Sequence, residues 1–150
     1  GRLALFENEW REITSNPKVL HAVSGYKIPF ISTPPARPFL REPSLSPIES
    51  ENCDNEIKRL YAMGAIVTSD PSEDQFLSSF FLIKKSSRGI RFILNLRDLN
   101  TYLFPPHFKM EDWRTVVRLM LPNYVMATID LEDAYFSVPI HPSHSKFLRF

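Results

Sequence analysis

The sequence predicts a mixed α/β fold of the α+β class, in which helices accompany an antiparallel hairpin. Two apolar stretches, residues 80–83 and 90–96, flank a short basic segment that contains a glycine, as two strands flank a turn. Several other segments repeat apolar residues at helical spacing between residues that favour helix starts and stops. With 43% hydrophobic and 23% charged residues among 150, the chain can build the core of about one domain.

Residues 1–37 are expected to form a helical and proline-rich extension. Apolar residues at helical spacing predict a helix over residues 2–14. Asn16 followed by Pro17 is a favourable helix start, and Gly25 is a stop, so a second short helix is expected over residues 17–23. Six prolines between residues 26 and 50 remove backbone donors, which predicts an extended segment that runs over the surface.

The rest of the chain alternates helical and strand-like segments. A helix is expected over residues 51–63, with Gly64 at its end, and a short strand over residues 65–68. After the hairpin, we expect a loop over 97–108, a helix over 111–120 and a strand over 125–129. Residues 146–150 alternate as in a strand, and a chain that stops inside such a run suggests a piece of a longer protein.

Charge is distributed unevenly along a chain whose formal net charge is only +1. Residues 80–100 contain one acid, Asp98, and five cations, namely Lys84, Lys85, Arg88, Arg91 and Arg97. A basic patch of this kind suits an anionic ligand. A solvated hairpin with no ligand is the other interpretation.

Cysteine, histidine and hydropathy exclude several classes of protein. Cys53 is the only cysteine, so no intrachain disulfide and no cysteine-based zinc site can form. His141 and His144 lack a partner ligand, and a zinc site is not expected there. No apolar run approaches the roughly 20 residues of a membrane span, and no signal peptide is visible. These features favour an intracellular protein, in cytoplasm or nucleus, with no membrane partner.

The most informative feature is a group of acids after the apolar run 125–129. Asp130, Glu132 and Asp133 lie within four residues. Carboxylates at the end of a buried strand could hold Mg²⁺, which takes oxygen ligands and leaves room for substrate phosphates. Asp130 could instead be a helix N-cap with Asp133 as its N3 partner, a variant of the capping box. Spacing alone leaves both interpretations open.

Four sequence runs together resemble the reverse transcriptases of retroviruses and retrotransposons. Residues 81–85 look like the first strand of the fingers hairpin, and residues 91–100 look like its return strand with the Arg-acid-Leu-Asn sequence that follows. Residues 129–140 match the first catalytic motif of the palm closely. Residues 106–111 are similar to retrotransposon versions, including those of DIRS-type elements. The resemblance covers about residues 38–150. It implies part of a right-hand polymerase, with a fingers-like region over 38–124 and the truncated start of a palm over 125–150.

The resemblance also implies roles for the residues of the acidic motif. Asp130 would be a catalytic carboxylate that binds two Mg²⁺ ions, and Leu131 would offer its backbone carbonyl to one of them. Asp133 and Ala134 would present backbone amides to the phosphates of an incoming deoxynucleoside triphosphate (dNTP). Tyr135 would lie under the sugar and exclude a 2′-hydroxyl. Without the resemblance, a core aromatic is the simpler interpretation of Tyr135.

In the hairpin, the resemblance assigns phosphate contacts to two cations. Lys85 would reach the γ-phosphate and Arg91 the α-phosphate. The hairpin looks about one residue shorter than in retroviral enzymes, which leaves Lys84 as the alternative to Lys85. Arg97 is expected to have a structural role, such as a salt bridge within the fingers.

The sequence lacks the second catalytic motif of this family, a Tyr-x-Asp-Asp turn. The chain would therefore carry only part of an Mg²⁺-dependent nucleotidyltransferase and be inactive alone, whereas the full-length parent would copy an RNA or DNA template–primer. Two alternatives remain. One is a non-catalytic remnant or domesticated module that binds nucleic acid or protein. The other is an unrelated α/β domain with a capping box at Asp130.

Overall fold

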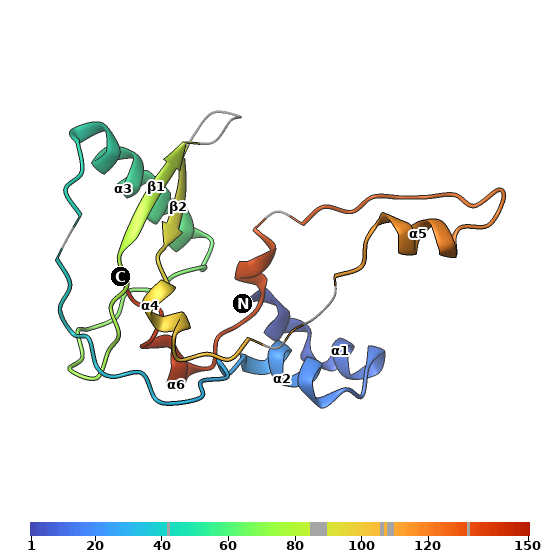
Figure 1. Ribbon diagram of the computed structural model, residues 1–150, viewed down its shortest axis with the longest axis horizontal. Coiled ribbons are helices and arrows are strands. Elements are labelled where there is room, and N and C mark those ends of the chain that lie inside the picture. Colours follow the sequence, from blue (N-terminus) through green and yellow to red (C-terminus); the bar gives the residue numbers. More distant parts are fainter. Residues whose placement is uncertain (42, 85–89, 106, 108–109, 132) are drawn as a thin grey trace.

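The protein is described here from a computed structural model covering residues 1–41, 43–84, 90–105, 107, 110–131 and 133–150 (Figure 1). The fold is mixed α/β, with helices and a two-stranded antiparallel sheet, in agreement with the predicted α+β class. The elements run in the order η1 (Arg2–Phe6), α1 (Glu7–Ile13), α2 (Pro17–Gly25), α3 (Pro47–Ala62), β1 (Phe80–Lys84), β2 (Ile90–Leu94), α4 (Arg97–Asn100), α5 (Trp113–Leu119), η2 (Ala134–Ser137) and α6 (Pro142–Ser145).

The N-terminal helices form where the sequence predicts them. The helix expected over residues 2–14 is present as a 3₁₀ turn, η1, that continues into α1. The side chain of Asn16 accepts a hydrogen bond from Lys18 N at 3.0 Å and so caps α2. None of the described residues of the proline-rich segment that follows is helical before α3, as expected from its missing backbone donors.

Helix α3 begins at Pro47, four residues before the predicted start. Its N-terminus is a capping box, because Ser46 Oγ accepts from Glu49 N while the Glu49 carboxylate accepts from Ser46 N. The far end is where the sequence predicts it, since Gly64 adopts a φ of +69°, which residues with a Cβ rarely adopt.

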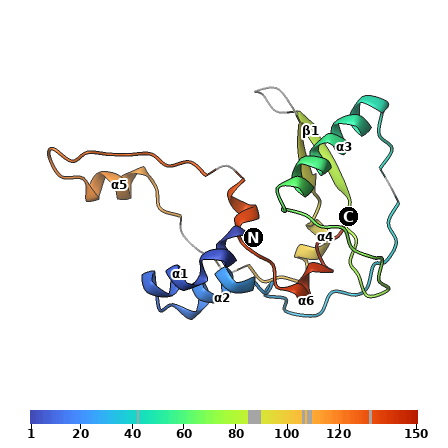
Figure 2. The same cartoon turned by 180° about the vertical axis from the view of Figure 1, so that it is seen from behind.

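The predicted hairpin is confirmed. Strands β1 and β2 pair antiparallel, with Phe80 opposite Leu94 and Lys84 opposite Ile90. The return strand ends at Leu94, two residues before the predicted end. Helix α3 lies against one face of this sheet and contacts β2 (Figures 1 and 2). The predicted tip around Lys85 lies outside the described residues.

The core is small and joins segments from three parts of the chain. Phe76, Leu99 and Phe147 are buried together. Around them, residue 37 bridges to residue 76 and residue 77 bridges to residue 149, both in parallel orientation. Leu99 belongs to α4, a short helix in a segment expected to be a loop. Burial of Leu99 in this core explains the turn, because residues 97–100 by themselves contain no helical repeat.

Two segments predicted to be strands have no strand partner. Residues 65–68 and 125–129 make no ladder among the described residues, and Val125 and Ile129 are 97% and 86% exposed. A strand exists only through hydrogen bonds to a neighbour, so an apolar β-branched run without one stays irregular. Residues 146–150 likewise form only the single bridge at Arg149 rather than a strand.

Helix α5 and the irregular segment after it form an arm that extends away from the rest of the structure (Figures 1 and 2). The helix is two residues shorter at its start than predicted, because Asp112 caps it by accepting from Arg114 N and Thr115 N. Among the described residues, no helix has both the length and the apolar composition needed to cross a bilayer.

Candidate functional site

Asp133 is held by an ion pair with the helix that covers the hairpin. Arg59 in α3 donates from Nη1 to Asp133 Oδ2 at 2.8 Å. The same guanidinium donates to both carboxylate oxygens of Glu56, at 2.8 and 3.0 Å. The hydrogen bonds to Glu56, and then that to Asp133, raise the pKa of Arg59, so its charge is permanent. One fixed cation therefore bridges two carboxylates, those of Glu56 and Asp133.

The backbone at Asp133 is left-handed, with a φ of +51°, and the 3₁₀ turn η2 starts directly after it at Ala134. Asp133 stands at the N-cap position of η2, but its side chain accepts no capping hydrogen bond. Asp130 lies outside η2 and is not a cap either. The capping-box interpretation of these two acids is therefore wrong in this structure.

Asp130, Leu131 and Tyr135 face solvent, whereas Ala134 is half-buried. Asp130 and Leu131 lie in the irregular segment and are exposed. Tyr135 is 94% exposed, so the core-aromatic interpretation of this residue is wrong. The predicted strand that would end at Asp130 is absent, for the reason given above.

The hairpin cations lie in a different part of the structure. Arg91 stands opposite Ile83 on β2 and is exposed, and Lys84 is the last residue of β1 and is also exposed. Lys85 lies outside the described residues. The hydrogen bonds and ion pairs of the described residues do not connect Arg91 with Asp130, Asp133 or Tyr135.

The described residues do not form a complete metal site. No group of three or more histidine, cysteine, aspartate or glutamate side chains gathers among them. Asp130 is one exposed carboxylate, and Asp133 is already paired with Arg59. A two-ion site needs several carboxylate oxygens to balance two dications, so these residues alone do not fit a pair of Mg²⁺ ions.

The N-terminal segment packs against the acidic motif. Element η1 contacts η2. A cavity of about 40 Å³ lies beside this contact, and its lining includes Gly1, Arg2, Asp133 and Phe136. Residues from the two ends of the chain therefore meet beside the motif, a relationship with no signal in the sequence.

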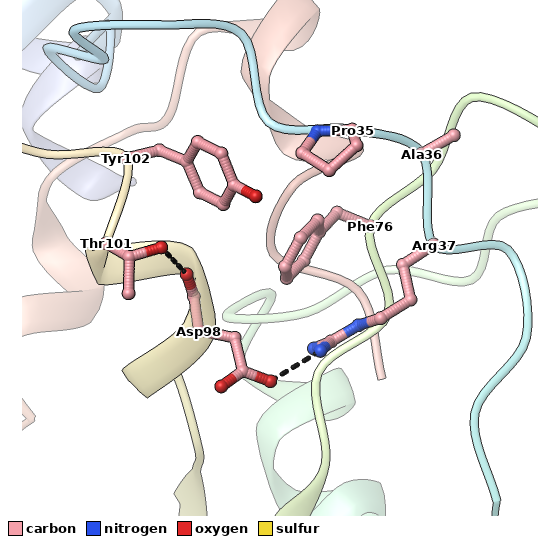
Figure 3. A pocket seen from close by; sticks show the side chains of 7 residues that line it. All are labelled: Pro35, Ala36, Arg37, Phe76, Asp98, Thr101 and Tyr102. Atoms are coloured by element: carbon pink, nitrogen blue, oxygen red, sulfur yellow. Dashed lines mark hydrogen bonds and ion pairs between the residues drawn. The ribbon is translucent and has the colours of Figure 1, made fainter.

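A larger cavity, of about 300 Å³, lies away from the acidic motif (Figure 3). It lies between the proline-rich segment and the core, with Tyr102 and Phe76 as aromatic walls and Arg37 and Asp98 as polar residues. The remaining lining residues are Pro35, Ala36 and Thr101.

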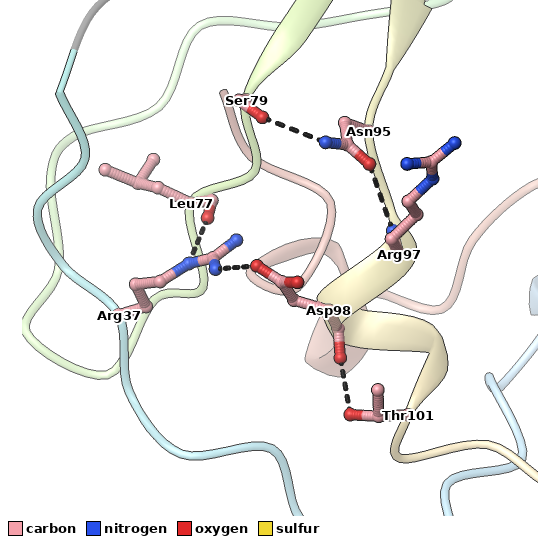
Figure 4. Close-up of polar contacts among 7 residues, drawn as sticks. All are labelled: Arg37, Leu77, Ser79, Asn95, Arg97, Asp98 and Thr101. Carbon is pink, nitrogen blue, oxygen red and sulfur yellow. Dashed lines mark hydrogen bonds and ion pairs between the residues drawn. The ribbon is translucent and has the colours of Figure 1, made fainter.

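Arg37 makes polar contacts with two other segments beside this cavity (Figure 4). Its Nη1 donates to Asp98 Oδ2 and its Nε to the Leu77 carbonyl oxygen, both at 2.6 Å, and its guanidinium lies 4.2 Å from the centroid of the Phe76 ring. The salt bridge found in this segment joins Arg37 to Asp98, the residue after Arg97. The Arg97 side chain, for which a salt bridge was expected, points away from that pair (Figure 4).

No protein-family model matches the chain. Over 81 residues, which are 54% of the chain, the sequence is 30% identical to the Gag-Pro-Pol polyprotein of squirrel monkey retrovirus. The matched stretch spans 4% of that polyprotein's length. The similarity points to a retroelement origin for this chain.

Proposed function

We propose that this chain is a segment of a retroelement RNA-directed DNA polymerase, and that it supplies the fingers hairpin and the first acidic motif of the palm. The observation that carries the proposal is the run 129–140 together with a hairpin that presents Lys84 and Arg91 to solvent at its outer end. The similarity to a retroviral polyprotein supports it. In the full-length protein the substrates would be a dNTP and an RNA or DNA template–primer.

Within this proposal, each part of the segment has a distinct task. Asp130 and the Leu131 carbonyl would contribute oxygen ligands to Mg²⁺, with the remaining ligands supplied from outside this chain. The amides of Asp133 and Ala134 would face the phosphates, and the exposed ring of Tyr135 would contact the sugar. Arg91, with Lys85 or Lys84, would bind phosphate oxygens as hydrogen-bonding cations.

The isolated chain is expected to be inactive as a polymerase. One free carboxylate cannot hold two dications, and the described residues supply no cluster of further carboxylates that would complete the metal site. Incubation of the chain with a primed RNA template, Mg²⁺ and dNTPs should give no primer extension above that of its Asp130→Ala variant. Template-dependent extension by the isolated chain would contradict this assignment.

The decisive experiment uses a full-length polymerase that contains this segment. Asp130→Asn should abolish primer extension and leave the melting temperature unchanged, because the amide keeps the side-chain size but loses the charge that binds the ions. Asp54→Asn, a matched change at an exposed acid in α3, should keep wild-type rates. Wild-type extension by Asp130→Asn would overturn the proposal.

Tyr135 gives a second readout of the same proposal. Tyr135→Val should keep DNA synthesis and increase the incorporation of ribonucleotides, since it opens space for a 2′-hydroxyl. Primer extension with dNTPs and with ribonucleotides, on the same template, measures the ratio. An unchanged ratio would remove Tyr135 from the sugar contact.

A non-catalytic binding module is the second candidate. The apolar arm favours it, because Trp113, Val117, Val125 and Ile129 are all exposed, and contiguous exposed apolar surface commonly marks an interaction site. The reading frame after residue 150 separates the two candidates. A Tyr-x-Asp-Asp run there supports the polymerase, and a stop codon supports the binding module.

A further inference from the structure

The N-terminal segment is attached to the residues after the acidic motif by a short backbone ladder. Tyr26 N donates to the Pro139 carbonyl oxygen at 2.7 Å, and His141 N donates to the Tyr26 carbonyl oxygen at 3.0 Å. The next contact is of a different kind, because Ile28 N donates to a side chain, His144 Nδ1, at 3.0 Å. This hydrogen bond requires that Nδ1 carry no proton.

The surroundings of His144 favour the neutral imidazole. Its ring lies 5.6 Å from the Phe30 ring and 5.8 Å from the Phe147 ring, measured between centroids. This burial lowers the pKa of His144 from its ordinary value of 6.5, and the nearby positive groups lower it further. Those groups are His141, Lys27 and Lys146. Of these, Lys146 is itself paired with Asp74.

The attached segment also reaches the acidic motif. Helices α1 and α2 pack on η1, and η1 contacts η2 next to Asp133. Loss of the contacts at residues 26–28 would therefore loosen a unit that covers one side of η2, including the wall of the small cavity formed by Phe136.

We propose that His144 is a pH-dependent latch, which strengthens the attachment of residues 26–28 to residues 139–144 when its imidazole is neutral and weakens it when Nδ1 is protonated. Protonation removes the acceptor for Ile28 N and adds a third positive charge to those of Lys27 and Lys146. The direction follows from the lowered pKa of His144: the contribution of this hydrogen bond is fully present above pH 6.5 and is lost as the pH falls through the lowered pKa. The latch does not depend on the polymerase assignment.

The test follows the amides of Tyr26 and Ile28 in the 150-residue chain by NMR hydrogen exchange, with intrinsic exchange corrected, between pH 8 and pH 5. Protonation of His144 should weaken amide protection by about fivefold or more, the factor that one such hydrogen bond supplies. The chemical shifts of the His144 ring report its protonation in the same samples. A His144 that becomes protonated while the protection of both amides is retained would overturn the latch.

Two substitutions isolate the acceptor. His144→Asn places an amide oxygen near the position of Nδ1 that cannot be protonated, so docking should persist and lose its pH dependence. His144→Phe keeps an aromatic ring without an acceptor, and the two amides should have the weakened protection at every pH. His141→Asn is the matched control, since the His141 ring accepts from Ser143 N next to it, and the pH dependence should remain, with a midpoint moved upward by the loss of a neighbouring imidazole. If the protection of the two amides still falls with pH in His144→Asn, the proposal is contradicted, even if His144→Phe fails to fold.

Discussion

Arg59 and Asp133 form an ion pair of 2.8 Å across 74 positions of the chain. The pair joins α3, which packs on the hairpin, to the first residue before η2. Arg59 also donates to both carboxylate oxygens of Glu56, and these two hydrogen bonds fix the orientation in which the guanidinium binds Asp133. The acidic motif is thereby tied to the body of the fold at Asp133, while Asp130 stays exposed.

The first prediction concerns this pair. Arg59→Ala should lower the free energy of unfolding by about 1 kcal/mol or less, since both side chains are partly exposed to water. A double-mutant cycle with Asp133→Asn, measured by urea denaturation, should give a coupling that shrinks in 1 M salt. Arg59→Lys is the control, because it keeps the charge but loses the two-pronged contact with Glu56. Strict additivity of the two single changes would show that the pair has no energetic role.

The second prediction concerns Arg37, which connects the proline-rich segment to the core. Arg37→Ala should lower the free energy of unfolding by about 2 kcal/mol, from two hydrogen bonds and the contact with the Phe76 ring. Arg37→Lys should recover only part of this, because one ammonium cannot reach both acceptors in the planar geometry of a guanidinium. Asp98→Asn should have a smaller effect, since its side chain is largely exposed. Chemical denaturation of the three variants gives the order, and equal losses would refute it.

The third prediction tests the core. Leu99 is 2% exposed, and Leu99→Ala should lower the free energy of unfolding by about 3 kcal/mol, through lost burial and the cavity left behind. Leu5→Ala is a matched change at a residue that is 79% exposed, and its effect should stay within about 0.5 kcal/mol. Thermal and urea unfolding of both variants provide the comparison. Similar losses in the free energy of unfolding for Leu99→Ala and Leu5→Ala would show that Leu99 is not part of the core.

The fourth prediction concerns acid titration at the start of α3. The Ser46 hydroxyl, and then the Ser46 backbone amide, hold the pKa of Glu49 below its ordinary value of 4.5. Ser46→Ala should raise the pKa of Glu49, which a carbon-13 titration of its carboxyl group measures directly. Because the lowered pKa stabilises the folded chain above pH 4.5 and this contribution is lost on acidification, the variant should also depend less on pH there. An unchanged pKa in Ser46→Ala would show that the hydroxyl is not the cause.

Elements with local signals could be predicted from the sequence. The Asn16 cap, the stop at Gly64 and the hairpin β1–β2 all depend on residues a few positions apart, so their physics is contained in short windows. The start of α3 was predicted too late because the capping box at Ser46 and Glu49 lies before the helical repeat begins. That signal was present in the sequence and would have placed the start at Pro47.

The candidate site also contains residues that the sequence indicates and a contact that only the structure shows. The sequence pointed to Asp130, Asp133, Tyr135 and Arg91 as functional residues, and their chemical roles stay predictions. The cation that pairs with Asp133 had no signal, because Arg59 belongs to a helix 74 positions earlier and only packing brings the two together.

The sequence by itself determined the Asn16 cap, the stop at Gly64 and the pairing of β1 with β2, because hydrogen bonds between near neighbours decide these features. Only the tertiary structure decided which residues are buried and which charges are paired. Residues 125–129 have the composition of a strand but find no partner among the described residues, whereas Leu99 becomes helical and buried because Phe76 and Phe147 meet it. Strand pairing, burial and ion pairing depend on contacts between distant segments, and no local pattern contains them.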